Sequence, residues 1–181
     1  LAPAKRLDRL LRVIKLALER ESDLHLVVVG DGDERPAIER LIDDLGLRQH
    51  VALLGARRDI PALLKQQAAV LALTSDDEGF ANVIIEAMAA SVPVITTPAG
   101  DSGMIVEDGV TGFVRPPDDV QAMADQIVRL LRDHDLRARF GAAGRRRVET
   151  QYDFPTLQAR LISLFDEVLQ AKASRRQNPA R

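Results

Sequence analysis

The sequence from His25 to Gly46 reads HLVVVGDGDERPAIERLIDDLG, and it contains a complete strand–turn–helix unit. Its first part is a β-branched run that ends at Gly30, which is typical of a strand covered on both faces of a sheet. Asp31-Gly-Asp33 then forms a turn, and Pro36 is well placed in the first turn of a helix. Gly46 stands where a helix C-terminus commonly has glycine. We therefore expect one βα unit in this stretch.

The same alternation continues along the chain. Four further apolar runs predict strands at residues 51–54, 70–73, 93–97 and 111–114. A helix is expected at about 5–21, and the end of the chain is helical, at residues 120–132, 135–148 and 154–173. Strands that alternate with helices indicate right-handed βαβ units. The expected fold class is therefore α/β, a doubly wound parallel sheet of about five to six strands with a helical C-terminal part.

Length and composition narrow the possible functions. With 181 residues we expect one domain over residues 1–173 and a tail at 174–181. The net charge of −2 gives no electrostatic footprint for nucleic acid, and the absence of Cys excludes disulfides and thiolate chemistry. Only three His are present, far apart, so we expect no metal site. No apolar run approaches the ~20 residues of a membrane span and no signal peptide is visible, which favours a cytoplasmic protein.

The chain starts at Leu1 without an initiator Met and runs directly into a helical pattern. We interpret it as a piece of a longer protein. In a doubly wound sheet, ligands bind outside the carboxyl ends of the strands. That rule points to the loops after Val29, Leu54, Leu73 and Thr97. Gly30-Asp-Gly32 is only half of a dinucleotide fingerprint, and a turn that needs positive φ is the simpler interpretation.

The loop from Ser75 to Asn82 carries a stronger signal. Glu78 stands just before an expected helix whose open first turn offers backbone N–H groups to an anion. The alternative is that the acidic residues of this loop merely cap the helix. The neighbouring Asp76-Asp77 pair is more simply solvated than bound to metal.

Glu86 lies inside an otherwise apolar helix, residues 83–90, which we expect to be mostly buried. A buried carboxylate needs hydrogen-bond partners. Asn82 lies four residues earlier on the same helix face. A carboxylate there could accept two hydrogen bonds from a diol such as ribose. The alternative is that Glu86 reaches solvent on a narrow polar stripe.

The run from Glu78 to Glu86, EGFANVIIE, resembles the motif of retaining glycosyltransferases of the GT-B fold, in the large group 1 family (family 4). Further segments agree with that family in order and spacing over residues 1 to about 165. They are Val28-Val-Gly-Asp-Gly, Leu45-Gly-Leu, Val51-Ala-Leu-Leu-Gly55, Asp59-Ile-Pro61, Pro93-Val-Ile-Thr96, Asp108-Gly-Val-Thr-Gly112 and Pro116-Pro-Asp-Asp119.

The resemblance implies a Rossmann-like, C-terminal domain that binds a nucleotide-diphosphate sugar, which is the donor substrate. It implies hexosyl transfer to a sugar, lipid or polysaccharide acceptor in bacterial polysaccharide or glycolipid biosynthesis, with no cofactor and no metal. The acceptor-binding N-terminal domain of the same protein would be the partner, so this chain alone is expected to be inactive. The resemblance also places a partner Arg and most of the domain's first strand before Leu1.

The family's functional residues map onto matching positions of this sequence. The catalytic residues implied are Lys5, which neutralises the diphosphate, and Glu78, which contacts the donor sugar. Glu86 is implied to hold the ribose hydroxyls. The full set implied to bind the donor is Gly30, Gly55, Ala56, Arg57, Gly79, Phe80, Ala81, Asn82, Val83 and Glu86, where residues 55–57 lie against the nucleobase. One departure is Met104, which stands where the family commonly has an acid.

Two alternatives remain open at this point. One is half of a non-hydrolysing nucleotide-sugar epimerase, which would need catalytic acids and a His. The other is a non-catalytic nucleotide-binding or interaction domain. A run of basic residues such as Arg145–Arg147 is usually a solvated helix face. The minority interpretation is a peripheral contact to acidic lipid at the inner membrane face.

Overall fold

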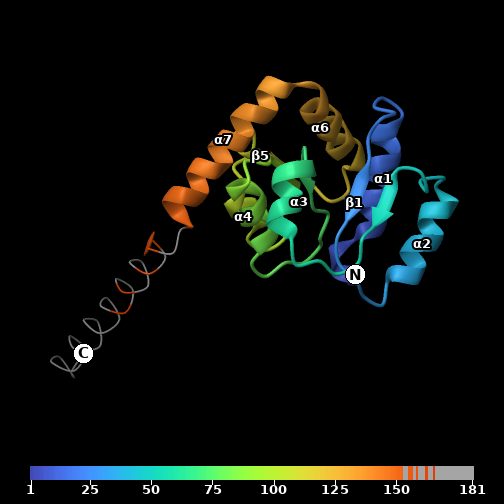
Figure 1. The fold of residues 1–181 in the computed structure, drawn as a ribbon, viewed down its shortest axis with the longest axis horizontal. Coiled ribbons are helices and arrows are strands. Elements are labelled where there is room, and N and C mark those ends of the chain that lie inside the picture. The colour runs from blue at the N-terminus through green and yellow to red at the C-terminus, as the bar shows by residue number, and fades with distance from the viewer. Residues whose placement is uncertain (153–154, 157, 159–161, 163–164, 166–181) are drawn as a thin grey trace, which may run out of the picture.

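The computed structural model describes residues 1–152 together with residues 155, 156, 158, 162 and 165 (Figure 1). Most of the expected helix at 154–173, the domain boundary at 173 and the tail at 174–181 therefore lie outside the described residues.

Helices and strands alternate along the described chain as expected. In chain order the elements are η1 Pro3–Lys5, α1 Leu7–Leu18, β1 Leu26–Val28, α2 Arg35–Asp44, β2 Val51–Leu53, α3 Ile60–Gln67, β3 Leu71–Ala72, α4 Asn82–Ala89, β4 Val94–Thr96, α5 Ser102–Ile105, β5 Gly112–Val114, α6 Val120–Arg132 and α7 His134–Gln151. Every strand pair is parallel. The predicted α/β fold class is confirmed.

The strands form two separate sheets in the described part of the chain. One sheet pairs β1 with β2, and the other has the order β3-β4-β5. A pairing between β1 and β3, which would join the sheets into one, is not present among the described residues.

Helices cover both faces of the β3-β4-β5 sheet, because adjacent residues of a strand point to opposite faces. Ile95 of β4 packs in one core cluster with residues of α1 and α6. Its neighbour Val94 packs in another, with residues of α3, α4 and α7. The third cluster joins α1 and α2 over β1 and β2. The sheet thus has helices on both sides, as a doubly wound fold requires.

Strand β1 departs from the expectation that it is covered on both faces. Val28 is buried, but the side chain of Val27 is 46% exposed. Helices α1 and α2 pack on the buried side of β1 and β2. On the opposite side Ala52 and Leu54 are also exposed. The prediction that β1 is covered on both faces was therefore wrong for the part of the chain that the structure describes.

Helix α7 crosses α4 closely at two glycines. A Cβ atom at position 141 would lie 2.1 Å from the carbonyl oxygen of Ser91, just after α4. One turn on, a Cβ at position 144 would lie 3.2 Å from Cγ of Met88. The close approach fixes α4, whose first turn borders the candidate site.

Candidate functional site

Loops that follow neighbouring strands meet at the carboxyl edge of the β3-β4-β5 sheet. The Thr97 hydroxyl, after β4, donates a 2.5 Å hydrogen bond to the Ser75 carbonyl oxygen, after β3. Gly100 has a φ of +51°, and a Cβ there would lie 1.7 Å from the carbonyl oxygen of Glu78. The loop that carries Glu78 is therefore held tightly from the β4 side.

The N-terminal turn η1 holds the same loop from the other side. The backbone N–H of Asp76 donates to the Ala4 carbonyl oxygen at 2.9 Å. The Thr74 hydroxyl donates to the Arg6 carbonyl oxygen, also at 2.9 Å. These contacts place Lys5 directly beside Glu78.

Lys5 and Glu78 form an ion pair, so the two side chains predicted to be catalytic lie together. Lys5 Nζ is 2.7 Å from both carboxylate oxygens of Glu78, and the Ser75 hydroxyl donates to one of them at 2.7 Å. The Glu78 side chain is 9% exposed, whereas that of Lys5 is 54% exposed. Burial alone raises the pKa of the Glu78 carboxyl, but the hydrogen bonds from Lys5 and Ser75 and the Lys5 charge outweigh it. The net pKa lies below its ordinary value.

Asp76 is clamped by two arginines that the sequence did not mark as site residues. Arg6 Nη1 and Arg9 Nη2 each lie 2.7 Å from an Asp76 carboxylate oxygen. Arg9 is buried and also donates from Nη1 to the Thr74 carbonyl oxygen at 2.6 Å. The hydrogen bonds from Arg6 and Arg9 lower the pKa of Asp76. Asp76 is exposed to solvent as predicted, but the prediction missed that two arginines also bind it.

Glu78 does not cap the helix that follows it. Helix α4 begins at Asn82 with Ala81 at its N-cap, and the cap makes no side-chain hydrogen bond. The carboxylate instead accepts from Lys5 and Ser75. The capping alternative is therefore wrong for Glu78. The first turn of α4 remains without a side-chain acceptor.

Glu86 is exposed rather than buried, so the expectation of a buried carboxylate was wrong. Helix α4 buries Ile84, Ala87 and Met88, and Glu86 lies on the remaining polar stripe. Glu86 and Asn82 nevertheless both line a large cavity. The predicted common face of these two side chains is confirmed.

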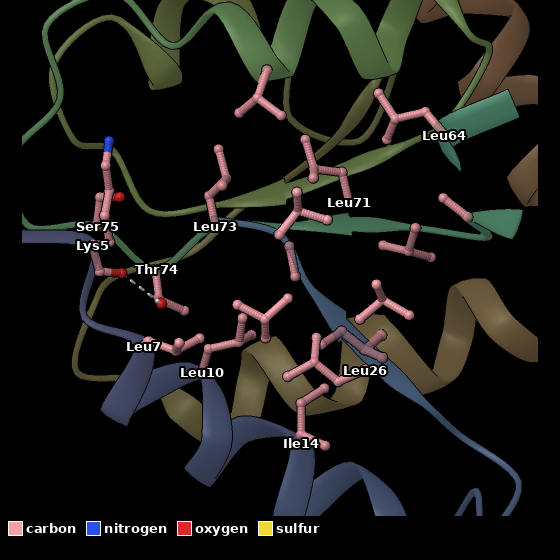
Figure 2. A pocket seen from close by; sticks show the side chains of 18 of the residues that line it. Lys5, Leu7, Leu10, Ile14, Leu26, Leu64, Leu71, Leu73, Thr74 and Ser75 are labelled. Atoms are coloured by element: carbon pink, nitrogen blue, oxygen red, sulfur yellow. Dashed lines mark hydrogen bonds between the residues drawn. The ribbon is translucent and has the colours of Figure 1, made fainter. Parts of the chain in front are cut away.

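This cavity also holds much of the remaining predicted site. It has a volume of about 1340 Å³ and is lined at one end by Lys5, Ser75 and Glu78. Phe80, Ala81 and Val83 also line it. Figure 2 shows that its other part lies between apolar side chains of α1 and of β3, with Leu10 and Ile14 on one side and Leu71 and Leu73 on the other. The cavity therefore has a polar end at the site and an apolar remainder.

The loop after β1 contributes Val29 and Glu34 to the cavity lining, but not its predicted site residue Gly30. The Gly30 N–H donates to the Gly55 carbonyl oxygen at 2.8 Å, so the two loops touch. Ala56 and Arg57 are exposed, and the Arg57 guanidinium bonds to the Asp59 carboxylate at 2.8 and 2.6 Å. Gly30, Gly55, Ala56, Arg57 and Gly79 are not among the cavity-lining residues.

Within the described residues, no three His, Asp or Glu side chains come together in a way that could hold a metal ion. None of the helices over that same part of the chain is long and apolar enough to cross a bilayer. Arg145 and Arg147 donate to backbone carbonyls of Ala89 and Ile105, each at 2.9 Å, so both also serve the packing of α7.

The chain is similar in sequence to known glycosyltransferases. A family profile described as "Glycosyl transferases group 1" matches residues 1–147. The chain belongs to the group 1 glycosyltransferases. Among curated relatives, N-acetyl-alpha-D-glucosaminyl L-malate synthase of Bacillus anthracis is 32% identical over 149 residues, which is 82% of this chain and 39% of that protein. The chain thus spans less than half the length of this relative.

Solved structures of other glycosyltransferases superpose well on the chain. Anabaena Alr3699/HepE, in complex with UDP and glucose, has a TM-score of 0.84 at 28% identity, over 92% of this chain and 46% of that one. The C-terminal domain of the group 1 glycosyltransferase LpcC from Francisella tularensis has a TM-score of 0.75 at 25% identity, over 85% of this chain and 83% of that one. These likenesses agree with a C-terminal domain of a group 1 glycosyltransferase.

Proposed function

We propose that this chain is the donor-binding domain of a retaining glycosyltransferase. The donor is a nucleotide-diphosphate sugar, and a hexosyl group passes to a sugar, lipid or polysaccharide acceptor bound largely by an N-terminal domain of the same protein. The observation that carries the proposal is the meeting of Lys5, Glu78 and the uncapped start of α4 at the carboxyl edge of the sheet. The UDP and glucose bound by the HepE structure support a donor of this class.

Lys5 supplies the positive charge for the leaving group. Breaking the anomeric C–O bond leaves negative charge on the diphosphate, and a nearby cation stabilises that charge more in the transition state than before it. The Lys5 ammonium is half exposed and so accessible to a phosphate. N–H groups in the first turn of α4 add further positive potential without a metal ion.

Glu78 and Glu86 divide the donor between them. Glu86 and Asn82 face the cavity from the same side of α4, where a carboxylate can accept hydrogen bonds from ribose hydroxyls. Glu78 precedes the helix and would contact the sugar. The resemblance to retaining glycosyltransferases supports front-face retention, in which the leaving phosphate helps to deprotonate the acceptor.

The positions of the histidines argue against the epimerase alternative. His25 and His50 precede β1 and β2, and their ring centroids lie 5.5 Å apart at the amino ends of these strands. His134 begins α7 and, like His25, lines the cavity, but its ring contacts the Arg137 guanidinium. None of the three lies at the carboxyl edge beside Glu78.

Isothermal titration of this chain with UDP-, GDP- and ADP-sugars tests the proposal. We expect one of the three to bind, and Lys5→Met to weaken that binding by about tenfold, because a charged hydrogen bond is worth about 1.5–3 kcal/mol. Lys15→Met is the matched control, since Lys15 is exposed on α1. Absence of binding for all three nucleotide sugars would contradict the donor-binding role. Measurable glycosyl transfer by the 181-residue chain alone would contradict the need for an acceptor domain.

A further inference from the structure

Helix α1 buries an arginine close to the candidate site. Arg9 lies among the residues that α1 buries, which include Leu10, Val13 and Ile14. Over the part of the chain that the structure describes, it is the one basic residue that is buried. A buried charge is costly unless it is paired and hydrogen-bonded, and replacing a buried ion pair with apolar residues is often neutral or stabilising. Stability alone therefore gives no reason for an arginine at this position.

The Arg9 guanidinium bonds two groups of the loop that leads to Glu78. Its Nη1 donates to the Thr74 carbonyl oxygen at 2.6 Å, and its Nη2 lies 2.7 Å from an Asp76 carboxylate oxygen. A guanidinium is a planar fork, so it can hold two acceptors at once in a fixed geometry. Arg9 thus fixes the two residues on either side of Ser75.

Ser75 carries this constraint to Glu78. The Ser75 hydroxyl donates to the Glu78 carboxylate at 2.7 Å. The Ser75 carbonyl oxygen accepts from the Thr97 hydroxyl at 2.5 Å. With both neighbours of Ser75 held from α1 and Ser75 itself held from the loop after β4, the place of the Glu78 carboxylate is set by backbone far from it in sequence.

The same two loop residues carry the constraint to Lys5. The Thr74 hydroxyl donates to the Arg6 carbonyl oxygen at 2.9 Å and lies 3.3 Å from the Lys5 carbonyl oxygen (Figure 2). The Asp76 N–H donates to the Ala4 carbonyl oxygen at 2.9 Å. The backbone on both sides of Lys5 is therefore bonded to Thr74 and Asp76.

We propose that Arg9 is a positioning residue of the candidate site, which holds Glu78 beside Lys5 by way of Thr74 and Asp76. Arg9 is not among the residues that line the cavity, so it acts through these neighbours rather than on a ligand. That the placement serves donor binding rests on the proposed function, whereas the placement itself does not. A preorganised site binds more tightly because less ordering is left to be done on binding. Losing the Arg9 fork should weaken the diphosphate site without removing any group from it.

The first experiment replaces the fork and keeps the charge. In Arg9→Lys an ammonium group cannot hold both acceptors in the geometry of a guanidinium. When the Glu78 carboxyl is titrated by NMR, its midpoint should move upward, because Lys5 is then less well placed to stabilise the carboxylate. Arg12→Lys is the matched control at an exposed position of the same helix, and it should titrate like the parent.

Titration calorimetry with UDP, GDP and ADP gives the second readout. A nucleoside diphosphate that binds the parent should bind Arg9→Lys roughly fivefold or more weakly, and should bind Arg12→Lys as it binds the parent. Unlike loss of the Glu78 side chain, this change keeps both charges of the pair and alters only where the backbone places them. An arginine with a purely structural role would lower Tm and leave the Glu78 midpoint and the affinity of the folded protein unchanged.

A second variant, Arg9→Met, is used if Lys at this buried position prevents folding, with Arg12→Met as its control. Failure of both Arg9 variants to fold would make Arg9 a structural residue and overturn the proposal. A folded variant with an unchanged Glu78 midpoint would also overturn it. A shifted midpoint with unchanged nucleotide affinity would overturn the link from Arg9 to donor binding. If no nucleoside diphosphate binds the parent, the proposed function is contradicted, and the Glu78 midpoint alone decides the role of Arg9.

Discussion

Lys5 and Glu78, 73 positions apart in the sequence, form an ion pair with 2.7 Å from the ammonium nitrogen to each carboxylate oxygen. The pair neutralises the cation on which the proposed function depends. A diphosphate that reaches the site therefore competes with Glu78 for Lys5. Under the proposed function, donor binding would be an exchange of partners by Lys5, and Glu78 would become available to the sugar when the exchange occurs.

Replacing Glu78 with Ala should separate sugar recognition from nucleotide recognition. In this chain, affinity for a nucleoside diphosphate should be retained, with a gain no larger than about fivefold, because an exposed ion pair is worth about 1 kcal/mol or less. In the enzyme that contains this domain, turnover should fall more than donor affinity, since contacts to the sugar matter most as the anomeric bond breaks. Calorimetry and steady-state kinetics measure the two effects. Loss of nucleoside diphosphate binding in Glu78→Ala would contradict the proposal that Glu78 recognises the sugar and not the nucleotide.

Glu86→Gln should weaken binding of a nucleoside diphosphate that carries no sugar. A carboxylate that accepts hydrogen bonds from a diol contributes about 1.5–3 kcal/mol, so the dissociation constant should rise roughly tenfold or more. Titration calorimetry on the two proteins measures the difference. Glu19→Gln, at an exposed Glu beyond the end of α1, is the matched control and should bind like the parent. Equal affinity of the Glu86 variant and the parent would remove the ribose assignment.

Lys5→Met should raise the pKa of the Glu78 carboxyl. The Lys5 hydrogen bonds and charge lower that pKa against a burial effect that raises it. Without Lys5, burial is opposed only by the Ser75 hydrogen bond, and the pKa should move upward. Side-chain carboxyl titration by NMR would follow the change, with Lys15→Met as the control. An unchanged titration midpoint would mean that the pair seen here does not form in solution.

Acid should destabilise the domain through Glu78 and Asp76. The ordinary pKa is 4.5 for the Glu78 carboxyl and 3.8 for the Asp76 carboxyl. In the folded chain both pKa values lie below these. The unfolded chain therefore takes up their protons at a higher pH than the folded chain does. Their stabilising effect is present above about pH 4.5 and is lost as the pH falls toward the folded pKa values.

Urea unfolding measured between pH 7 and pH 3 tests this pH dependence. The free energy of unfolding should fall over the acidic part of the range, and Asp76→Asn should make the fall shallower. A variant whose profile runs parallel to that of the parent would show that Asp76 does not contribute.

Gly141→Ala should destabilise the packing of α7 on α4. The added Cβ would lie 2.1 Å from the Ser91 carbonyl oxygen, so one helix must move. Overpacking of this kind costs about 1–3 kcal/mol of unfolding free energy. Thermal and urea unfolding measure it. Ala142→Ser, at the exposed neighbouring position, is the control and should unfold like the parent.

The sequence predicted the elements better than their surroundings. The β-branched run before Gly30 and the apolar spacing of residues 120–132 mark β1 and α6 correctly, because both signals are local. The exposure of a side chain, by contrast, depends on which distant segments pack against it. Val27 is half exposed since nothing in the described chain covers that side of β1, and Glu86 is exposed although its helix is apolar.

The sequence predicted only part of the candidate site. The loop before a helix marked Glu78, a family resemblance supplied Lys5, and the structure places the two in contact. The Arg6 and Arg9 clamp on Asp76 was missed, because its partners lie far apart in the sequence and no spacing marks them. The only local signal was an Arg between Leu7 and Leu10 at the start of an amphipathic helix, and that pattern is common in solvated helices.

Gly100 helps to set the shape of the candidate site, although it has no side chain that could contact a ligand. Any other amino acid at this position would collide with the backbone of Glu78. For protein engineers, position 100 would therefore be an indirect control on sugar preference if Glu78 contacts the sugar as proposed. A library that varies the loop after β4 should keep Gly100 constant when the aim is to change contacts, and should vary it alone when the aim is to shift the Glu78 backbone.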